Sequence, residues 1–247
     1  MTAGTPQEQL MLELTNRARM NPAAEAARLN VALDPGQGSP KPILAMNNRL
    51  QVASDRHGNW MLINDQFNHQ ESTAFPNGRT GLEPGDRMRA AGYTFTGNWT
   101  WGENIAWSGT TGTLNATAAI YGHHEALFRS DGHRANTLNA VFREAGIGQQ
   151  IGDYRGYHAS MLTENFARSG TTLFVSGALF NDTDRDFFYD VGEQVAGRSV
   201  TATGVSDRGR RRLCAQLQHD RLEDDQLRNA FGDHISKCQR GQHQFED

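Results

Sequence analysis

The chain has 247 residues, of which 37% are hydrophobic and 21% charged, and its net charge is −4. This length and composition are typical of one folded domain with a small appendage, and they exclude a disordered or collagen-like chain. No stretch approaches the roughly 18–20 consecutive apolar residues that cross a bilayer, and no excess of positive charge attracts nucleic acid. We therefore expect neither a membrane span nor a nucleic-acid partner.

The positions of the cysteines and the sequence of the N-terminus limit further the class of protein to which the chain can belong. The only cysteines, Cys214 and Cys238, lie near the C-terminus. The first two hundred residues therefore cannot contain a disulfide or a thiolate-ligated metal. The N-terminus has neither the basic segment nor the apolar segment of a secretory signal peptide. Composition by itself leaves the cytosol and export by another route both open.

The first part of the chain is predicted to be helical. Thr5-Pro6-Gln7-Glu8 has the capping-box pattern and begins a helix that continues through Ala18. Asn21-Pro22 restarts a helix that continues to Leu29. Three prolines and two glycines predict a loop at 34–42, and 67–102 is expected to be mostly loop. The remaining predicted helices span 44–63, where His57 lies on the packed face, 84–91 and 114–128.

Strands follow the helices. Residues 144–151, 158–166 and 172–179 are predicted strands, and this order indicates an α+β fold with helices packed on an antiparallel sheet. A second strand is expected at 195–202, and the charged segment beyond it is expected to be disordered. The predicted organisation is a main domain at 1–168, a small β-module at 169–205 and a tail at 206–247.

Three short segments contain residue types that perform chemistry. His69 follows the end of a predicted helix, and His133 begins a short one after the Asp131-Gly132 turn. Between them, Glu103 is expected on a turn directly before apolar residues that would fix its direction. The helix before His133 also contains His123, His124 and Glu125.

In this order and spacing, these segments resemble the bacterial branch of the CAP superfamily (cysteine-rich secretory, antigen 5 and pathogenesis-related 1 proteins). The resemblance covers residues 7–167 and implies a three-layer α-β-α sandwich whose central cleft is lined by two His and two Glu. His69, Glu103 and His133 match three of these positions. Glu125 and His124 are both candidates for the fourth, and only one can face the cleft because adjacent helical residues diverge by about 100°. The motifs are Leu12–Arg19, Phe67–His69, Gly102–Ala106 and Ser130–Asn136.

This set of residues is compatible with several functions. Two imidazoles and a carboxylate form a ligand set for Zn²⁺ with one position left for water. With His69 and His133 as ligands and Glu103 as general base, the site would hydrolyse peptide or ester bonds. The alternatives are a cleft for a small apolar ligand such as a lipid or sterol, a site for a cell-surface component, a scaffold or adhesin with a vestigial cleft, and a hydrogen-bonded cluster that stabilises loop ends. No H-E-x-x-H helix is present, so an ordinary zinc peptidase is excluded.

An acidic segment predicts a calcium loop. In Asp182–Glu193, aspartates occupy positions 1, 3, 5 and 9 of a twelve-residue loop, Glu occupies position 12, and position 7 supplies a main-chain carbonyl. Phe187 stands at position 6, where glycine is usual, so we expect a strained or altered turn there. The alternative is an acidic, solvated turn. The expected ligands are Asp182, Asp184, Asp186, Phe188, Asp190 and Glu193.

Strands rather than helices are predicted on both sides of this loop, so the segment resembles the first third of the calcium-binding B-type repeats of bacterial surface adhesins. Millimolar Ca²⁺ outside the cell would fill a weak loop of this kind. We therefore expect an extracellular bacterial protein, monomeric and exported without an N-terminal signal peptide through a type I route.

Overall fold

A computed structural model describes residues 4–71, 82–172, 174, 176–195, 201–204 and 215–218. The chain divides into two compact units, Met1–Ser176 and Gly177–Asp247. The domain boundary expected after residue 168 falls inside the first unit. No helix in the described ranges is both long enough and apolar enough to cross a membrane.

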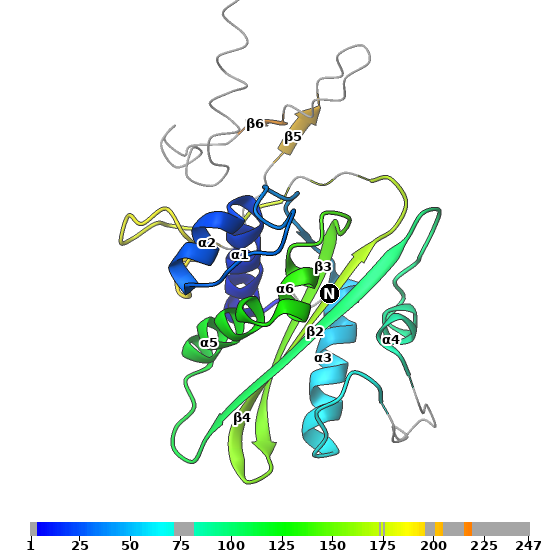
Figure 1. Cartoon of the computed structure of the whole chain (residues 1–247), viewed down its shortest axis with the longest axis vertical. Coiled ribbons are helices and arrows are strands. Elements are labelled where there is room, and N and C mark those ends of the chain that lie inside the picture. The colour runs from blue at the N-terminus through cyan, green and yellow to red at the C-terminus, as the bar shows by residue number, and fades with distance from the viewer. Residues whose placement is uncertain are drawn as a thin grey trace, which may run out of the picture. The chain divides into compact units, whose positions relative to one another are not determined.

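The first unit is built on a four-stranded mixed sheet. Its spatial order is β1-β3-β4-β2; Figure 1 shows its long strands β2, β3 and β4. β3 pairs antiparallel with β4, and β4 pairs antiparallel with β2, which is an edge strand. The short β1 runs parallel to β3, which the antiparallel prediction did not include. The strands are β1 (Ala45–Met46), β2 (Thr100–Thr110), β3 (Glu144–Tyr154) and β4 (Tyr157–Arg168).

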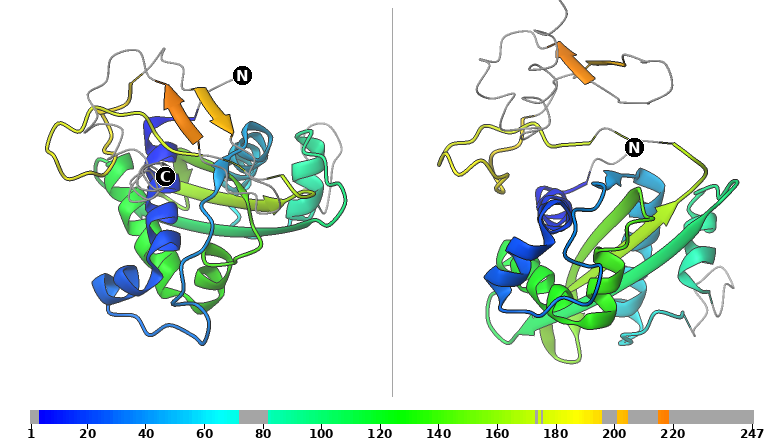
Figure 2. Two further views of the ribbon diagram at one scale, coloured as in Figure 1. Left: turned by 90° about the horizontal axis from the view of Figure 1, so that it is seen from above. Right: turned by 45° about the horizontal axis from the view of Figure 1, so that its top comes forward.

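Helices cover both faces of this sheet, which confirms the predicted α+β sandwich (Figures 1 and 2). One face is covered by α3 (Asn48–Ile63) and α4 (Pro84–Ala90). The helices on the other side are α1 (Pro6–Met20), α2 (Pro22–Leu29), α5 (Ala116–Arg129) and α6 (Asp131–Thr137).

Local sequence signals set the helix ends. The Thr5 hydroxyl accepts a hydrogen bond from the Glu8 N–H at 3.2 Å, and the Glu8 carboxylate accepts from the Thr5 N–H at 2.7 Å, so the predicted capping box begins α1. α3 begins at Asn48 and not at residue 44. The reason is that Asn47 caps it, while residues 45–46 extend and pair with β3.

Two glycines of β3 allow α3 to lie directly on the sheet. A Cβ at Gly146 would lie 2.1 Å from the main-chain nitrogen of Gln51, and a Cβ at Gly148 would lie 2.7 Å from that of Asp55. This close packing buries Leu50, Ala53, Trp60 and Met61 completely against the strands. The α3 side chains that face β2 are therefore held in fixed positions.

Two predictions about strands and turns were wrong. Residues 100–110 form the long strand β2, so Glu103 lies in the middle of a strand and not on a turn. Residues 172, 174 and 176–179 lie outside any strand, whereas a strand was expected at 172–179.

In the second unit, β5 (Thr201–Gly204) pairs antiparallel with β6 (Ala215–Gln218). β6 lies in the tail that was expected to be disordered. The rest of that tail is outside the described residues.

Candidate functional site

The site surrounds the edge strand β2, where successive side chains point to opposite faces of the sheet. The Glu103 side chain points to the face of α3 and α4, where it contacts Arg87. The next residue, Asn104, points to the other face and donates to the main-chain oxygen of His133 on α6 at 3.2 Å. Two predicted site residues, Glu103 and His133, are therefore attached to opposite sides of the same strand.

The Glu103 carboxylate is buried and paired with cationic or hydrogen-bonding groups. His69 Nδ1 lies 2.9 Å from its Oε1, and a terminal nitrogen of Arg87 donates to Oε2 at 2.5 Å. With its amide oriented so that the oxygen accepts from Ser54, Asn165 donates to Oε2 at 3.1 Å. Burial alone would raise the pKa of Glu103, but the hydrogen bond from His69 and the positive charge of Arg87 lower it. The carboxylate therefore stays ionised, and both of its oxygens have hydrogen-bonding partners.

Arg87 organises this cluster. Besides Glu103, it donates to the main-chain oxygens of His69, at 2.7 Å, and Leu82, at 2.8 Å. Its Nε lies 3.5 Å from Oε1 of the buried Glu71. One guanidinium thus holds both the main chain of His69 and the carboxylate that contacts its ring.

His57 also belongs to this cluster, although the sequence indicated only a packing residue of α3. Its ring is fully buried and stacks on Trp60, with centroids 5.7 Å apart. Its Nδ1 lies 3.1 Å from Glu71 Oε1, and its Nε2 lies 3.9 Å from Glu103 Oε1. Sequence reasoning did not find Glu71, Arg87 or Asn165, because the partners are distant in the chain and share no local pattern.

His133 occupies the first turn of α6. Its Nδ1 is 2.8 Å from the hydroxyl of Ser130, the residue that precedes the helix. Desolvation by partial burial lowers the pKa of His133. His69 therefore contacts the side chain of Glu103, and the main chain of His133 contacts the side chain of Asn104, so the two residues flank the same edge strand; the His69 side chain is 47% exposed.

His124 and Glu125 lie elsewhere, packed against α2. His124 Nε2 is 2.8 Å from Oε1 of Glu25, and Glu125 Oε1 accepts from Arg28 at 2.9 Å. Although burial would raise the pKa of Glu25, hydrogen bonds from His124 and Arg28 lower it to about 2. Neither His124 nor Glu125 takes part in the cluster around Glu103. The preceding residue, His123, instead bonds Ser160.

The predicted zinc ligands do not fit a preformed metal centre. In the described part of the chain, no three ligand atoms drawn from His69, Glu103 and His133 lie within 4.8 Å of one another. Glu103 is neutralised by Arg87 and faces away from α6. The two imidazoles are suitable donors for a divalent cation, but the carboxylate is not available as a ligand.

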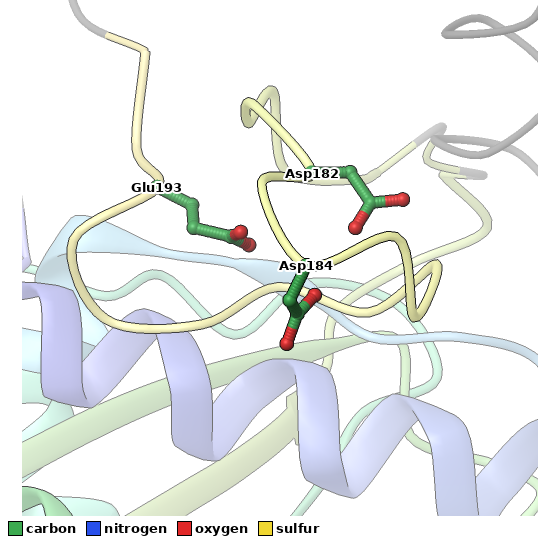
Figure 3. A group of neighbouring side chains, drawn as sticks. All are labelled: Asp182, Asp184 and Glu193. Carbon is green, nitrogen blue, oxygen red and sulfur yellow. The ribbon is translucent and has the colours of Figure 1, made fainter.

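Closely spaced acidic side chains occur instead in the loop Asp182–Glu193. Ligand atoms of Asp182, Asp184 and Glu193 lie within 4.8 Å of one another, and those of Asp184, Asp186 and Asp190 form a second such group. Glu193 reaches back from the far arm of the loop toward the arm that carries Asp182 and Asp184 (Figure 3). Desolvation and the charges of Asp186, Glu193 and Asp190 raise the pKa of Asp184. Negative charge is therefore concentrated at this loop.

Hydrogen bonds to the main chain fix the shape of this loop. Asp182 accepts from the N–H groups of Asp186, at 3.1 Å, and Phe187, at 3.2 Å. Glu193 Oε1 accepts from both the N–H and the hydroxyl of Thr183 at 2.7 Å. Phe187, at position 6, has a φ of 63°. The turn therefore has the left-handed conformation without a glycine. A non-glycine residue in this region costs about 1–3 kcal/mol, so the turn is strained.

A comparison with protein-family models identifies the family of this chain. A family model described as "CAP: Cysteine-rich secretory protein family" matches residues 12–166. A search of curated proteins gave no match. The solved structures to which the chain is similar include an extracellular protein containing a SCP domain from Bacillus anthracis, with 24% identity and a TM-score of 0.41. That alignment covers 66% of this chain but 40% of the Bacillus chain, so this chain spans well under two thirds of its length.

Two further structural neighbours are more distant in sequence. An outer surface protein from Borrelia burgdorferi is 13% identical, with a TM-score of 0.44, and the alignment covers 68% of this chain and 97% of that one. A cysteine-rich secretory protein from Staphylococcus aureus is 15% identical, with a TM-score of 0.35, and the alignment covers 68% of this chain and 40% of that one.

Proposed function

This chain belongs to the cysteine-rich secretory protein (CAP) family, whose model matches more than half of it, and we propose that it acts outside the cell as a Ca²⁺-binding member of that family. The observation that carries the proposal is the gathering of five carboxylates of the loop Asp182–Glu193 into two groups of three, which share Asp184. They stand at positions 1, 3, 5, 9 and 12, the spacing at which oxygen ligands surround Ca²⁺.

The electrostatics of the loop support a bound cation. Asp184 belongs to both acidic groups, so its charge is repelled from two sides when no cation is present. Burial would raise the pKa of Glu193, but hydrogen bonds from Thr183 and from the Asp190 N–H lower it, so this carboxylate is ionised and held in place. A preformed set of oxygen donors with excess negative charge is what a hard divalent cation requires.

The expected affinity fits an extracellular role. The left-handed Phe187 introduces strain, and half of the loop residues are solvent-exposed, so we expect a weak site. Weak oxygen-ligand sites in extracellular modules bind Ca²⁺ with dissociation constants of about 10⁻⁴–10⁻³ M. Such a site fills where Ca²⁺ is millimolar, which is outside the cell.

Calorimetric titration of the full chain with Ca²⁺ tests this proposal. We expect saturable binding in the wild type, at least tenfold weaker binding in Asp184→Asn, and unchanged binding in the control Asp153→Asn. Asp153 is an exposed aspartate that contacts only His158 among the described residues. Binding that survives in Asp184→Asn, or that falls equally in the control, would contradict the assignment.

The imidazoles of His69 and His133 support a second candidate function, the binding of a divalent cation such as Zn²⁺ by the first unit, Met1–Ser176, here called the CAP unit. His69 and His133 flank the same edge strand, and within the described ranges the Nε2 atom of neither ring has a hydrogen-bond partner. Both side chains would hold the cation through these nitrogen atoms, without Glu103. We expect His133→Ala to abolish Zn²⁺ binding measured by calorimetry at pH 7.5, and the control Glu125→Gln to keep it. Equal loss in both variants would refute this site.

The geometry does not favour a metal-assisted hydrolase. A general base must be free to accept a proton, whereas the Glu103 pKa is lowered and both of its oxygens are occupied. The following stay predictions from the resemblance: a lipid-like or sterol ligand, a cell-surface partner, an adhesin or scaffold role, the adhesin-like repeat, a type I route and a monomeric state.

A further inference from the structure

Two arginines lie side by side at one end of the sheet. Glu144 pairs with Ala167 across β3 and β4, so the preceding and following residues, Arg143 and Arg168, stand opposite each other at the strand ends. The Arg143 N–H donates to the Ala167 oxygen at 3.0 Å, which continues the ladder to this position. Like charges directly opposite each other on neighbouring strands are destabilising. This arrangement therefore requires compensation.

No acidic side chain in the described part of the chain supplies that compensation. Arg143 donates to main-chain oxygens, including that of Val141 at 3.0 Å, and Arg168 Nε donates to the Gly170 oxygen at 3.1 Å. The nearby Arg19 also donates only to main-chain oxygens. Desolvation and the charge of Arg168 lower the pKa of Arg143, and desolvation and the charge of Arg143 lower that of Arg19 to about 10. Positive charge accumulates here although the chain as a whole is acidic.

A solvent-open hollow of roughly 250 Å³ adjoins Arg168. Its apolar walls are Trp99 and Val141, whose exposed fractions are 47% and 41%. The Trp99 ring is held from behind by Phe95, with centroids 5.0 Å apart, and by the guanidinium of Arg89, which lies 5.4 Å from the ring centroid. The lining residues are Gly97, Asn98, Trp99, Thr100, Val141 and Arg168.

We propose that this hollow, here called the Arg168 pocket, binds a small organic anion. The anionic group, a carboxylate, sulfate or phosphate, is bound by the terminal nitrogens of Arg168, which have no partner in the described part of the chain. A flat apolar group packs between Trp99 and Val141. The anion also relieves the repulsion between Arg143 and Arg168. The hollow is smaller than the roughly 300–1,000 Å³ of pockets for drug-sized ligands, so we expect it to cover one or two rings of the bound anion.

The test uses 2-naphthoate and its uncharged analogue 2-naphthamide as probes of the full chain. Binding is followed by the shift of the Trp99 indole N–H resonance, which Trp99→Phe assigns by its disappearance. We expect saturable binding of 2-naphthoate that weakens as salt is added, and binding of 2-naphthamide weaker by about tenfold or more, or about 1.4 kcal/mol. Equal affinity for both probes, or no saturable shift, would overturn the proposal.

Matched variants separate the pocket from surface charge in general. Arg168→Gln should weaken 2-naphthoate binding by about tenfold, whereas Arg168→Lys, which keeps the charge, should weaken it less. Arg155→Gln is the control, because its guanidinium lies over Tyr154 at the other end of β3. Equal loss in the control, or an Arg168 dependence seen only with phosphatidylglycerol vesicles and not with 2-naphthoate, would overturn the assignment of a soluble ligand. Unchanged urea-unfolding midpoints show that each variant is folded.

Discussion

The buried carboxyl group of Glu164 makes the stability of the CAP unit depend on pH. Glu164 lies in β4 and is completely buried. Its Oε1 accepts from the Thr15 hydroxyl of α1 at 3.1 Å, and its Oε2 accepts from the Asn104 amide of β2 at 3.0 Å. Burial raises the pKa of Glu164 from 4.5 to about 7, against the lowering effect of these two hydrogen bonds. The folded state therefore favours the protonated carboxyl.

The sign of the effect follows from linkage. Below pH 4.5, Glu164 is protonated in both the folded and the unfolded chain, so its burial does not make the free energy of unfolding depend on pH there. Between pH 4.5 and about 7 the unfolded chain loses this proton first, and the free energy of unfolding falls. The difference between the two pKa values corresponds to a loss of about 3 kcal/mol once the pH exceeds 7. This is a large part of the ~5–15 kcal/mol that stabilises a typical domain.

Glu164→Gln removes this loss, because glutamine has the shape of the protonated carboxyl and never ionises. Its oxygen can accept from Asn104 while its nitrogen donates to the Thr15 hydroxyl. Relative to wild type, we expect the variant to be equally stable at pH 4 and more stable by about 2–3 kcal/mol at pH 8.

Urea unfolding at the two pH values measures the effect. All four tryptophans lie in the first unit, so their fluorescence reports its unfolding. Comparing the two proteins at each pH cancels the contributions of the other titrating groups to the pH dependence of stability. The variant Glu125→Gln, at an exposed position, serves as the control. If wild type and Glu164→Gln change stability in parallel between pH 4 and pH 8, the reasoning about this buried carboxyl is refuted.

Three further predictions concern the packing that holds the site. Gly146→Ala should destabilise the CAP unit by more than about 3 kcal/mol, because its Cβ would overlap the main chain of α3; urea unfolding should show no such loss for Gly132→Ala, which meets nothing within 4 Å. Arg87→Met should cost about 3–5 kcal/mol in the same assay, since it leaves Glu103 as a buried charge without its cation, and a loss below about 1 kcal/mol would contradict the network. Thr5→Ala should cost about 1 kcal/mol by removing the cap of α1, and an unchanged thermal midpoint would show that the cap contributes nothing.

Sequence signals predicted the elements whose ends are set locally. The capping box at Thr5 and the prolines at the starts of α2 and α4 fix those helices through residues within one turn. The acidic loop is equally local, because its carboxylates are spaced by the loop itself. β2 was missed for a physical reason. Both faces of this strand are covered near Glu103, so its buried residues form a continuous run rather than an alternating pattern.

The surroundings of the site residues depended on contacts that no local pattern records. The sequence predicted that His69 and His133 would be neighbours. It did not indicate that Arg87 would form an ion pair with the Glu103 carboxylate. It also offered His124 and Glu125 as alternatives for one cleft position. Both instead contact α2, whose Glu25 and Arg28 provide the opposite charges. Pairing between α2 and α5 is a tertiary contact, and only the folded chain shows it.

Terbium luminescence tests the calcium assignment most directly. Tyr189 lies inside the acidic loop, so its ring should transfer excitation energy to Tb³⁺ bound there in place of Ca²⁺. We predict Tb³⁺ emission on excitation at the tyrosine band, displaced by millimolar Ca²⁺, lost in Glu193→Gln, and strongly reduced in Tyr189→Phe while calorimetric Ca²⁺ binding persists. Emission that is unaffected by both substitutions would place the cation elsewhere and contradict the account.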